Sequence, residues 1–535
     1  MTVADADLLL PATDDLLRDG IERGDLLGVQ LVVHASDDRS VDLALGESGP
    51  DTEMTSDTLL HWFSLTKPFI ALAVLALERD GLLATDEPLS RVLPELAVEP
   101  RHRTITADDL FTHSVRFEND FESLWRIAWM DSSQVFRAAL QHPHQNGDGS
   151  SGTFQYSTWV GWAFLGEAIG RLVGGDQSTF MRERVFLPLG MVDSWVGMPD
   201  AAIDGYADRL ATQHFIGGPQ PVPLPAMHER PVIRQFLPSF GGRGPMREIA
   251  TFLRTVMDQR LPGSLAGLEP AMIEPRATGI ESSHFVPWLT DPVDWGAGVQ
   301  IGRGLFGSDC SPSSFGHNGQ ETLVAFADPV HDVVVAAGFN GMSGSVAAFE
   351  RQEQLVAAIY RDLGLSTEPR PLRYDPEQLE AARTRGASRS GSAPQRNAGS
   401  EAAAAASHGV ITSTFEAWRS GGVAPGLPGR VRHVVHADAT QFVFDVSSDG
   451  RELTLTLEPD PDEPVDFRVE CGWDTWRAQA AGALSYLRAL RAGALLLSGP
   501  SPGDFVADPS CPAFYTRWIA PIPVPPDGGT EIVPS

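Results

Sequence analysis

Lysine is almost missing from this chain. Of its 535 residues, 40 are lysine or arginine, and all of these except Lys67 are arginine. Arginine stays protonated at any working pH, whereas a buried lysine can lose its proton. We therefore interpret Lys67 as a residue that acts as a base. The alternative is a surface lysine without a role.

Positive charge and cysteine are also scarce. Aspartate and glutamate number 70, so the formal net charge is −30. Such a charge argues against nucleic acid and against anionic membrane surfaces as partners. Three cysteines cannot build a disulfide framework. No Cys/His cluster has the spacing of a zinc site, so we predict neither a metal nor another cofactor.

Long apolar runs are absent as well. No run of about eighteen apolar residues occurs, so we expect no stable membrane insertion. The first residues, MTVADAD, are acidic and lack the basic segment of a secretory signal, which predicts a cytoplasmic protein. What the chain does have is length and core material. Its 535 residues predict two domains or more, and 42% of them are hydrophobic.

Ser64 stands three residues before Lys67, at the start of the apolar run LTKPFIALAVLALE (65–78). Residues three apart on a helix share a face, so the amine should lie beside the hydroxyl. Apolar surroundings lower the pKa of a lysine, and a neutral amine next to a hydroxyl is a nucleophile with its base. Proline is tolerated only in a first turn, so Pro68 predicts a helix that begins close to Ser64. Free backbone N–H groups at such a helix start could hold an oxyanion.

The surrounding pattern predicts a mixed α and β domain. Helices are expected at 12–25, 159–172, 178–185, 245–258 and 346–363, and strands at 28–34, 41–46, 296–302, 321–328 and 332–339. Residues 100–150 should be helical with loops, and the proline-rich stretch 215–240 should line a cleft as an irregular lid. Helices between an N-terminal hairpin and C-terminal strands suggest one sheet with strands from both ends of the domain.

The domain boundaries follow from changes in composition. We predict a first domain at 1–370, a flexible linker at 371–408, a second domain at 409–522 and a disordered tail at 523–535. Within the second domain, strands are expected near 430–437, 441–447, 451–457 and 465–470, and helices near 473–481 and 484–491.

Two further motifs accompany the Ser64 and Lys67 pair. Tyr156 lies in GTFQYST (152–158), just before a predicted helix, and His317 lies in FGHNGQ (315–320), which enters a strand. Each has a plainer interpretation, because Tyr156 could be a core tyrosine and His317 a loop histidine. Cys310 lies close to His317 in sequence, but nothing places it at a helix start, so we take it as a bystander.

In order and spacing these motifs resemble the serine β-lactamase and penicillin-binding-protein superfamily. The resemblance is strongest to its class C-like branch, which includes family VIII esterases, D-aminopeptidases, some acyltransferases and thioesterases that cyclise peptides. It covers roughly residues 10–365 and extends to ITADDLFTHS (105–114), FLPLGM (186–191) and WGAG (295–298). It implies an α+β fold, in which helices flank an antiparallel sheet beside a helical subdomain, with a smaller C-terminal α+β domain following.

The resemblance also implies roles for single residues. Ser64 would be the nucleophile, and Lys67 and Tyr156 would jointly move its proton. The backbone N–H groups of Ser64 and Gln320 would form the oxyanion hole. The reaction would then be acyl transfer through an acyl-serine ester.

The third motif and its neighbours would contact the substrate. His317 would take the place of that motif's first residue, as a fourth catalytic residue, and Gly319 would let the substrate lie close to the strand. Asn318 and Thr158 are predicted to bind substrate too. Two departures matter, because relatives that act on β-lactams usually have asparagine in place of Thr158 and lysine in place of His317. Both changes favour an esterase, amidase or acyltransferase over a cell-wall enzyme.

The second domain resembles sterol-carrier-protein-like domains in DFRVECGWDTW (466–476), AGAL (481–484) and AGALLLSG (492–499). This resemblance implies a small sheet with helices around an apolar tunnel, and hence an apolar ligand. The alternative is a packing or dimerisation module.

Together these features predict a serine hydrolase that acts on the ester or amide of a small or peptidyl acyl substrate. An acyltransferase or peptide cyclase would use the same residues, as would a β-lactamase or D-aminopeptidase. A non-catalytic lipid-binding protein is a further alternative, although a dead site has no need of Lys67. The sequence indicates neither the substrate and acceptor nor the oligomeric state.

Overall fold

The structure is a computed structural model of the chain. Up to residue 366 it describes 9–36, 39–117, 127–128, 130–142, 154–216, 221–224, 227–280, 293–303, 306–343 and 345–366. Beyond them it describes the backbone of 429–437, 440–448, 453–457, 467–472 and 495–498. The chain divides into two units, Met1–Ile216 with Pro223–Leu379 and Gly217–Val222 with Glu380–Ser535, which we describe separately. The predicted linker 371–408 and tail 523–535 lie outside the described residues.

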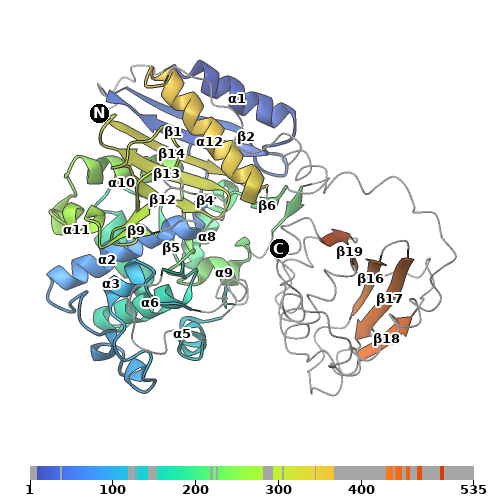
Figure 1. The fold of residues 1–535 in the computed structure, drawn as a ribbon, viewed down its shortest axis with the longest axis horizontal. Helices are drawn as coiled ribbons and strands as arrows, with labels where there is room; N and C mark the ends of the chain where they lie inside the picture. The colour runs from blue at the N-terminus through green and yellow to red at the C-terminus, as the bar shows by residue number, and fades with distance from the viewer. Residues whose placement is uncertain are drawn as a thin grey trace. The chain divides into compact units, whose positions relative to one another are not determined.

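A nine-stranded antiparallel sheet forms the centre of the first unit (Figure 1). Its order is β3-β2-β1-β14-β13-β12-β11-β10-β9. The strands are β1 Gly28–His34, β2 Ser40–Gly49, β3 Thr52–Glu53, β9 Ala277–Ile280, β10 Val293–Trp295, β11 Gln300–Ile301, β12 Phe315–Gly319, β13 Leu323–Asp328 and β14 Val333–Phe339. Because β1 pairs with β14, strands from both ends of the unit meet at the centre of the sheet, as predicted.

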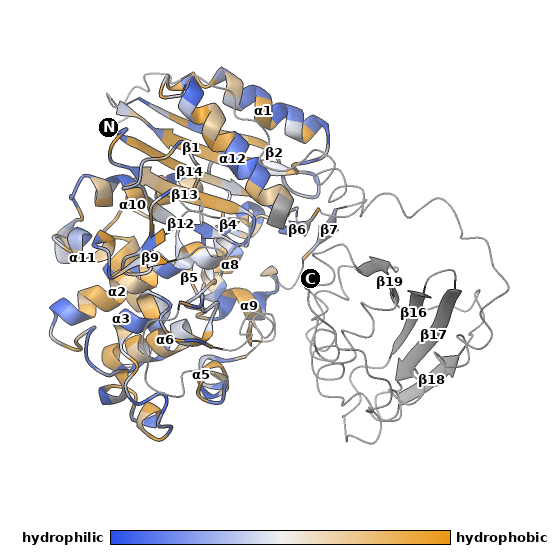
Figure 2. Ribbon diagram, viewed as in Figure 1, coloured by the Kyte–Doolittle hydropathy of each residue, from blue (hydrophilic) through white to orange (hydrophobic). Residues whose placement is uncertain are grey.

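Two terminal helices, α1 (Pro11–Glu22) and α12 (Ser345–Asp362), cover one face of this sheet (Figure 1). The core beneath them takes alternate residues of the central strands, such as Leu31 of β1, Val324 of β13 and Val335 of β14. The central strands are hydrophobic along most of their length (Figure 2). Strands of this kind are expected where both faces of a sheet are covered.

The opposite face is covered by α10 (Met246–Met257), which contacts β1, β13 and β14. Next to it lies α2 (Lys67–Arg79), whose first eleven residues are all buried. A helix that is apolar on every side is stable only inside a protein. Here α6 (Val160–Val173) packs on α2 and provides that cover.

Shorter elements complete the helical region. The helices are α3 Ala107–Phe111, α5 Ser132–Leu140, α7 Gln177–Met181, α8 Asp200–Gly205, α9 Arg230–Arg234 and α11 Glu269–Ile273. The π-helix η6 spans Arg182–Phe186, and single 3₁₀ turns are η2 Phe63–Thr66, η3 Leu89–Arg91, η4 Pro94–Ala97, η7 Ala207–Arg209 and η9 Gly263–Leu265.

Small strands connect these elements. A second sheet has the order β4-β8-β5, from Leu60–His61, Gly242–Gly244 and Trp195–Val196. β6 (His214–Phe215) pairs in parallel with β15 (Gly341–Met342), and β7 spans Val222–Pro223. The predicted lid, 215–240, therefore contains the end of β6, β7 and α9 among its described residues.

Most predicted elements are confirmed with small shifts in their ends, but one strand is wrong in extent. Of the predicted strand 296–302, only Gln300–Ile301 pairs as β11. Gly298 has a φ of +67°. A Cβ on Gly296 would lie 2.3 Å from the Met272 carbonyl. The chain bends here, and the preceding strand is β10, which the prediction omitted.

The second unit contains a five-stranded sheet of order β18-β17-β16-β19-β20. The strands are β16 Gly429–Ala437, β17 Thr440–Ser448, β18 Leu453–Leu457, β19 Phe467–Gly472 and β20 Leu495–Ser498. Pairing is antiparallel except between β16 and β19, which are parallel. Four of these strands coincide with predicted ones. The predicted helices 473–481 and 484–491 lie outside the described residues.

Candidate active site

Ser64 and Lys67 meet at the junction of the 3₁₀ turn η2 and helix α2. The Nζ atom of Lys67 lies 3.0 Å from the Oγ of Ser64 and 3.0 Å from the carbonyl oxygen of Ser239. The Lys67 side chain is completely buried, while Ser64 is partly exposed. Side chains three apart are eclipsed in a 3₁₀ turn, which explains the contact. Pro68 occupies the first turn of α2, as predicted.

The backbone before the serine is strained. Phe63 has a φ of +48°, in the left-handed region that non-glycine residues rarely occupy. Thr66 holds the turn, because its hydroxyl donates to the Phe63 carbonyl at 2.6 Å and accepts the Gly242 N–H at 2.8 Å. The Trp62 N–H also donates to the Gly242 carbonyl, at 2.8 Å. Strand β8 thus fixes the backbone from which Ser64 projects.

Ser239 is a member of the site that the sequence analysis missed. It is the second-last residue of the predicted lid, and its carbonyl accepts one N–H of Lys67 at 3.0 Å. The next carbonyl, of Phe240, lies 2.6 Å from Nε2 of His61 in β4. A backbone carbonyl can belong to any residue type, so no sequence signal could have identified it.

Tyr156 lies beside the lysine. The Nζ of Lys67 is 5.1 Å from the centre of the Tyr156 ring and 5.6 Å from that of Trp162 in α6. A cation at this distance from an aromatic face is attracted to it. Tyr156 is partly exposed. The structure therefore brings together Ser64, Lys67 and Tyr156, three of the four predicted catalytic residues.

His113 holds Tyr156 from the other side, and sequence analysis assigned it no role. Its ring stacks on the Tyr156 ring with centroids 4.3 Å apart. Its Nδ1 accepts the Ser157 N–H at 3.0 Å, and its carbonyl accepts the Gln155 N–H at 2.9 Å. His113 thus binds the backbone on both sides of Tyr156. The only signal was its place within the family-like stretch 105–114.

His317 completes the group from strand β12. Its ring centre lies 6.2 Å from that of Tyr156 and 5.9 Å from that of Trp295. Burial and the Lys67 charge lower the pKa of His317 to about 3. The neutral ring donates its Nδ1–H to the Asn318 carbonyl at 2.6 Å, which leaves the lone pair on Nε2.

Burial, together with the Lys67 charge, also lowers the pKa of His113 well below its ordinary value. His113 and His317 are therefore both neutral imidazoles at working pH. Neither ring therefore adds a positive charge beside Lys67.

Comparison with known proteins identifies this arrangement. The model of the beta-lactamase family matches residues 13–359. The chain belongs to the beta-lactamase family. Its first unit thus has the beta-lactamase and transpeptidase-like fold, an α+β fold with an antiparallel sheet and flanking helices.

Curated relatives within this family match over shorter stretches. Lovastatin esterase of Penicillium rubens is 29% identical over 170 residues, which are 28% of this chain and 42% of that protein. Esterase EstB of Burkholderia gladioli is 29% identical over 225 residues, which are 38% of this chain and 54% of that protein. The chain spans about half the length of these relatives.

Solved structures support the beta-lactamase fold. EstCE1, described as a hydrolase with promiscuous acyltransferase activity, superposes with a TM-score of 0.55 at 17% identity, covering 65% of this chain and 97% of that one. The D-amino acid amidase of Ochrobactrum anthropi SV3 gives 0.52 at 21% identity, covering 66% and 97%. At these identities the likeness establishes the fold alone.

The Asn318 side chain lies on the opposite face of β12 from His317. In the register of β12 and β13, Asn318 pairs with Val324 and His317 with Ala325. Val324 belongs to the core under α12, so its partner Asn318 lies on the α12 side of the sheet. Successive side chains of a strand alternate between faces, so His317 lies on the other side. The Asn318 amide donates to Gln352 of α12 at 3.2 Å. The substrate-binding role of Asn318 stays a prediction.

Gly319 has a structural reason for being glycine. A Cβ at this position would lie 2.4 Å from the Trp62 carbonyl oxygen. The glycine thus lets β12 approach the backbone just before Ser64, while its role in admitting substrate stays a prediction. Gln320 follows directly, which places the second predicted oxyanion donor beside the nucleophile turn. Thr158 is partly exposed and precedes Trp159, the N-cap of α6.

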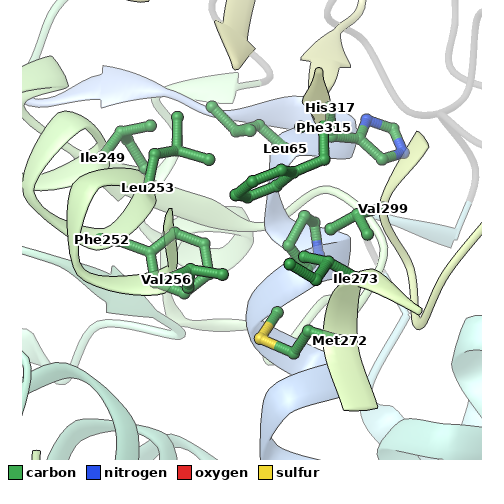
Figure 3. A pocket seen from close by; sticks show the side chains of 12 residues that line it. Leu65, Ile249, Phe252, Leu253, Val256, Met272, Ile273, Val299, Phe315 and His317 are labelled. Carbon is green, nitrogen blue, oxygen red and sulfur yellow. The ribbon is translucent and has the colours of Figure 1, made fainter. Parts of the chain in front are cut away.

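An apolar cavity lies behind the site (Figure 3). Leu65, Phe252, Val256, Val299 and Phe315 are among its lining residues. The His317 ring points away from the cavity interior (Figure 3). The cavity has a free volume of about 10 Å³, which is roughly the space for one water molecule. It is too small for a substrate.

The structure supports the exclusion of Cys310 as a nucleophile. Its side chain is buried in the core beneath α1 and α12, and burial raises the pKa of its thiol well above the usual value. Thiolate formation is therefore disfavoured. Within the described part of the chain, no group of three or more His, Cys, Asp or Glu side chains could hold a metal ion. Nor is any helix there long and apolar enough to cross a membrane.

Proposed function

We propose that this protein hydrolyses an ester or amide through an acyl-serine intermediate. The observation that carries the proposal is the 3.0 Å contact between Lys67 Nζ and Ser64 Oγ inside a buried, family-typical site. A neutral amine has two N–H groups and one lone pair. With one N–H donated to the Ser239 carbonyl, the lone pair can face the Ser64 hydroxyl and accept its proton.

Acylation then follows ordinary serine chemistry. The Ser64 Oγ attacks the substrate carbonyl carbon while its proton passes to the Lys67 and Tyr156 pair. The backbone N–H groups of Ser64 and Gln320 stabilise the negative oxygen of the tetrahedral intermediate. The intermediate collapses, the bond to the leaving group breaks, and the leaving group takes the proton from the same pair.

Deacylation reverses these roles. Water loses a proton to the Lys67 and Tyr156 pair and attacks the acyl carbon, and Ser64 leaves with a proton as the free acid departs. An alcohol or amine in place of water would give acyl transfer, and the cyclase alternative differs only in this acceptor.

The substrate we propose is an ester or amide without a carboxylate at the third motif. His317 is neutral, because its pKa is lowered to about 3, so it offers no fixed charge to an anion. The esterases among the matched relatives support an ester. We assign the chain to the class C-like, family VIII-type branch on the motifs around Tyr156 and His317.

For the second unit we propose binding of an apolar ligand by residues 409–522. This proposal rests on the sequence resemblance to sterol-carrier-protein-like domains. A preference for long acyl chains in the experiment below would favour it over a packing or dimerisation module.

The test is the mass of the intact protein after brief exposure to p-nitrophenyl esters with short and long acyl chains, beside nitrocefin. We expect an acyl adduct or turnover that is lost in Ser64→Ala and kept in Ser264→Ala, a change at an exposed serine. Added hydroxylamine diverts the product from the free acid if transfer competes with hydrolysis. Equal behaviour of wild type and Ser64→Ala with every donor would refute the proposal.

A further inference from the structure

The turn that joins β12 to β13 is built from unusual residues. Gln320 has a φ of +21° and Glu321 a φ of +61°. The Thr322 N–H donates to the Gly319 carbonyl at 2.8 Å, which closes a four-residue β-turn with Gln320 and Glu321 at its centre. A β-turn with positive φ at both central positions favours Asn-Gly or Gly-Gly pairs. A Gln-Glu pair is strained here, so other contacts must hold the turn.

Arg351 of α12 supplies such a contact. Its Nη2 donates to the Glu321 carbonyl at 2.5 Å, and its guanidinium carbon lies 4.0 Å from the centre of the Phe339 ring. Phe339 in turn donates its N–H to the Thr322 carbonyl at 2.8 Å. Arg351 therefore binds the turn at Glu321. It also stacks on Phe339, which is hydrogen-bonded to the next turn residue, Thr322.

The guanidinium is held in an environment that is unfavourable for a charge. Its Nε and Nη1 atoms are buried and have no hydrogen-bond acceptor among the described residues. Burial lowers the pKa of Arg351 to about 10. Burying donors without acceptors is costly, so their retention calls for a compensating role.

The other side of the turn faces the nucleophile. Gly319 packs on the Trp62 carbonyl, two residues before Ser64, and Gln320 would supply an oxyanion-hole N–H. A small rotation of this peptide would turn the N–H away from the developing charge. Because an oxyanion donor acts only when it is aimed in advance, the conformation of the turn decides its effect.

We propose that Arg351 is a positioning residue, which holds the strained turn so that the Gln320 N–H points into the oxyanion hole. This inference rests on the proposed function. The other predicted donor, the Ser64 N–H, has a similar arrangement. Thr66 holds Phe63, directly before Ser64, at a φ of +48°. Both donors thus come from strained backbone that a neighbouring side chain keeps in place.

The test compares Arg351→Met with Arg361→Met, which changes an exposed arginine near the end of the same helix. For a p-nitrophenyl ester, we expect Arg351→Met to lower kcat about 10-fold with KM changed less than 2-fold, since the donor is misaimed rather than removed. A phenylboronic acid, whose tetrahedral adduct places an oxygen in the oxyanion hole, should bind about 10-fold more weakly. Arg361→Met should change neither.

Glycine at the strained position provides the rescue. Glu321→Gly adopts positive φ without strain, so Arg351→Met/Glu321→Gly should recover at least 3-fold in kcat over Arg351→Met. If Arg351→Met does not fold, Arg351→Lys is measured instead, and a partial loss of boronate affinity with the same rescue is expected. A loss of thermal stability with boronate affinity and kcat unchanged would overturn the inference, as would the absence of rescue.

The failure of the two proposals can be told apart. If wild type shows no turnover that depends on Ser64, the proposed function itself has failed. If wild type turns over and Arg351→Met behaves like Arg361→Met, only the role of Arg351 is refuted.

Discussion

Lys67 Nζ and Ser64 Oγ lie 3.0 Å apart, in a contact imposed by the 3₁₀ turn that leads into a buried helix. The lysine has no exposed surface, and two imidazoles beside it are held neutral. A lysine placed in this way can serve as a base, whereas an arginine in the same place would remain charged. The single lysine of the chain and its burial thus have one common explanation.

Lys67→Arg should therefore inactivate the protein, because an arginine at this position stays protonated. We expect kcat/KM for an ester to fall about 10²–10⁴-fold, the range for loss of a general base. The kcat/KM of Lys67→Met should fall by a similar factor, because neither arginine nor methionine can accept the Ser64 proton. Circular dichroism checks that both variants fold. A Lys67→Arg protein that kept a tenth of the wild-type kcat/KM would contradict the role of the lysine as base.

His113→Phe separates the ring stack from the hydrogen bond behind Tyr156. The phenyl ring can still stack on Tyr156, but the Ser157 N–H loses its acceptor on Nδ1. We expect kcat to fall about 10-fold at nearly unchanged KM, because Tyr156 is positioned less well. The free energy of unfolding should fall by about 1–3 kcal/mol, the cost of a buried unsatisfied donor.

The matched control is His102→Phe, at another buried histidine, whose ring packs on Phe164. This variant should lower the free energy of unfolding without changing kcat. If both histidine variants lower kcat equally, His113 has only a general packing role.

The parts of the fold that could be predicted are those in which local pattern and burial agree. The run at 28–34 is apolar and forms β1 with the predicted bounds, and the spacing of Ser64 and Lys67 correctly predicts their contact. The sheet combines strands from both ends of the domain, as predicted, because β1 pairs with β14. In these places one physical requirement determines the structure.

The parts that could not be predicted depend on backbone geometry and register. The acceptor for Lys67 is a carbonyl, that of Ser239, which any residue type could supply. A shift of one residue in register moves every side chain of a strand to the other face of the sheet. The register of β12 against β13 therefore decides on which face the Asn318 side chain lies. The left-handed turn at Gln320 and Glu321 contains no glycine that would have indicated it.

Gly319→Ala tests the close approach of β12 to the nucleophile turn. The added Cβ would lie 2.4 Å from the Trp62 carbonyl oxygen, so the backbone before Ser64 must shift. We expect kcat/KM to fall on the order of 100-fold, because a displaced nucleophile loses alignment. The free energy of unfolding should fall by about 1–3 kcal/mol. Gly205→Ala, where the Cβ meets nothing within 4 Å, should do neither; similar kinetics in both variants would argue against the packing role.

Asn318→Ala tests whether that side chain binds substrate. Its amide bonds Gln352 of α12 at 3.2 Å, on the face opposite His317. We expect the free energy of unfolding to fall by about 1 kcal/mol while kcat/KM stays within about 2-fold of wild type. In Asn318→Ala/Gln352→Ala the two losses should not add, because they remove one shared hydrogen bond. A large rise in KM for Asn318→Ala would contradict this expectation and support the predicted substrate-binding role.

The burial of His317 should make stability depend on pH. The pKa of its ring is about 3 in the folded protein, against about 6.5 for an unfolded chain. Between these values the unfolded chain binds a proton that the folded protein does not. The free energy of unfolding should therefore fall as pH drops below about 6.5, by about 1.4 kcal/mol for this residue between pH 7.5 and 5.5.

His317→Gln removes this titration, and urea unfolding at pH 7.5 and 5.5 measures its effect. Wild type should lose about 1.4 kcal/mol more than the variant over this interval. Ser264→Ala, which changes no titrating group, should follow wild type. The other buried histidines, such as His61 and His113, are common to all three proteins and cancel in the comparison. An equal loss in wild type and His317→Gln would mean that His317 titrates alike in the folded and unfolded states, and its neutrality could then no longer account for the proposed lack of charge at the third motif.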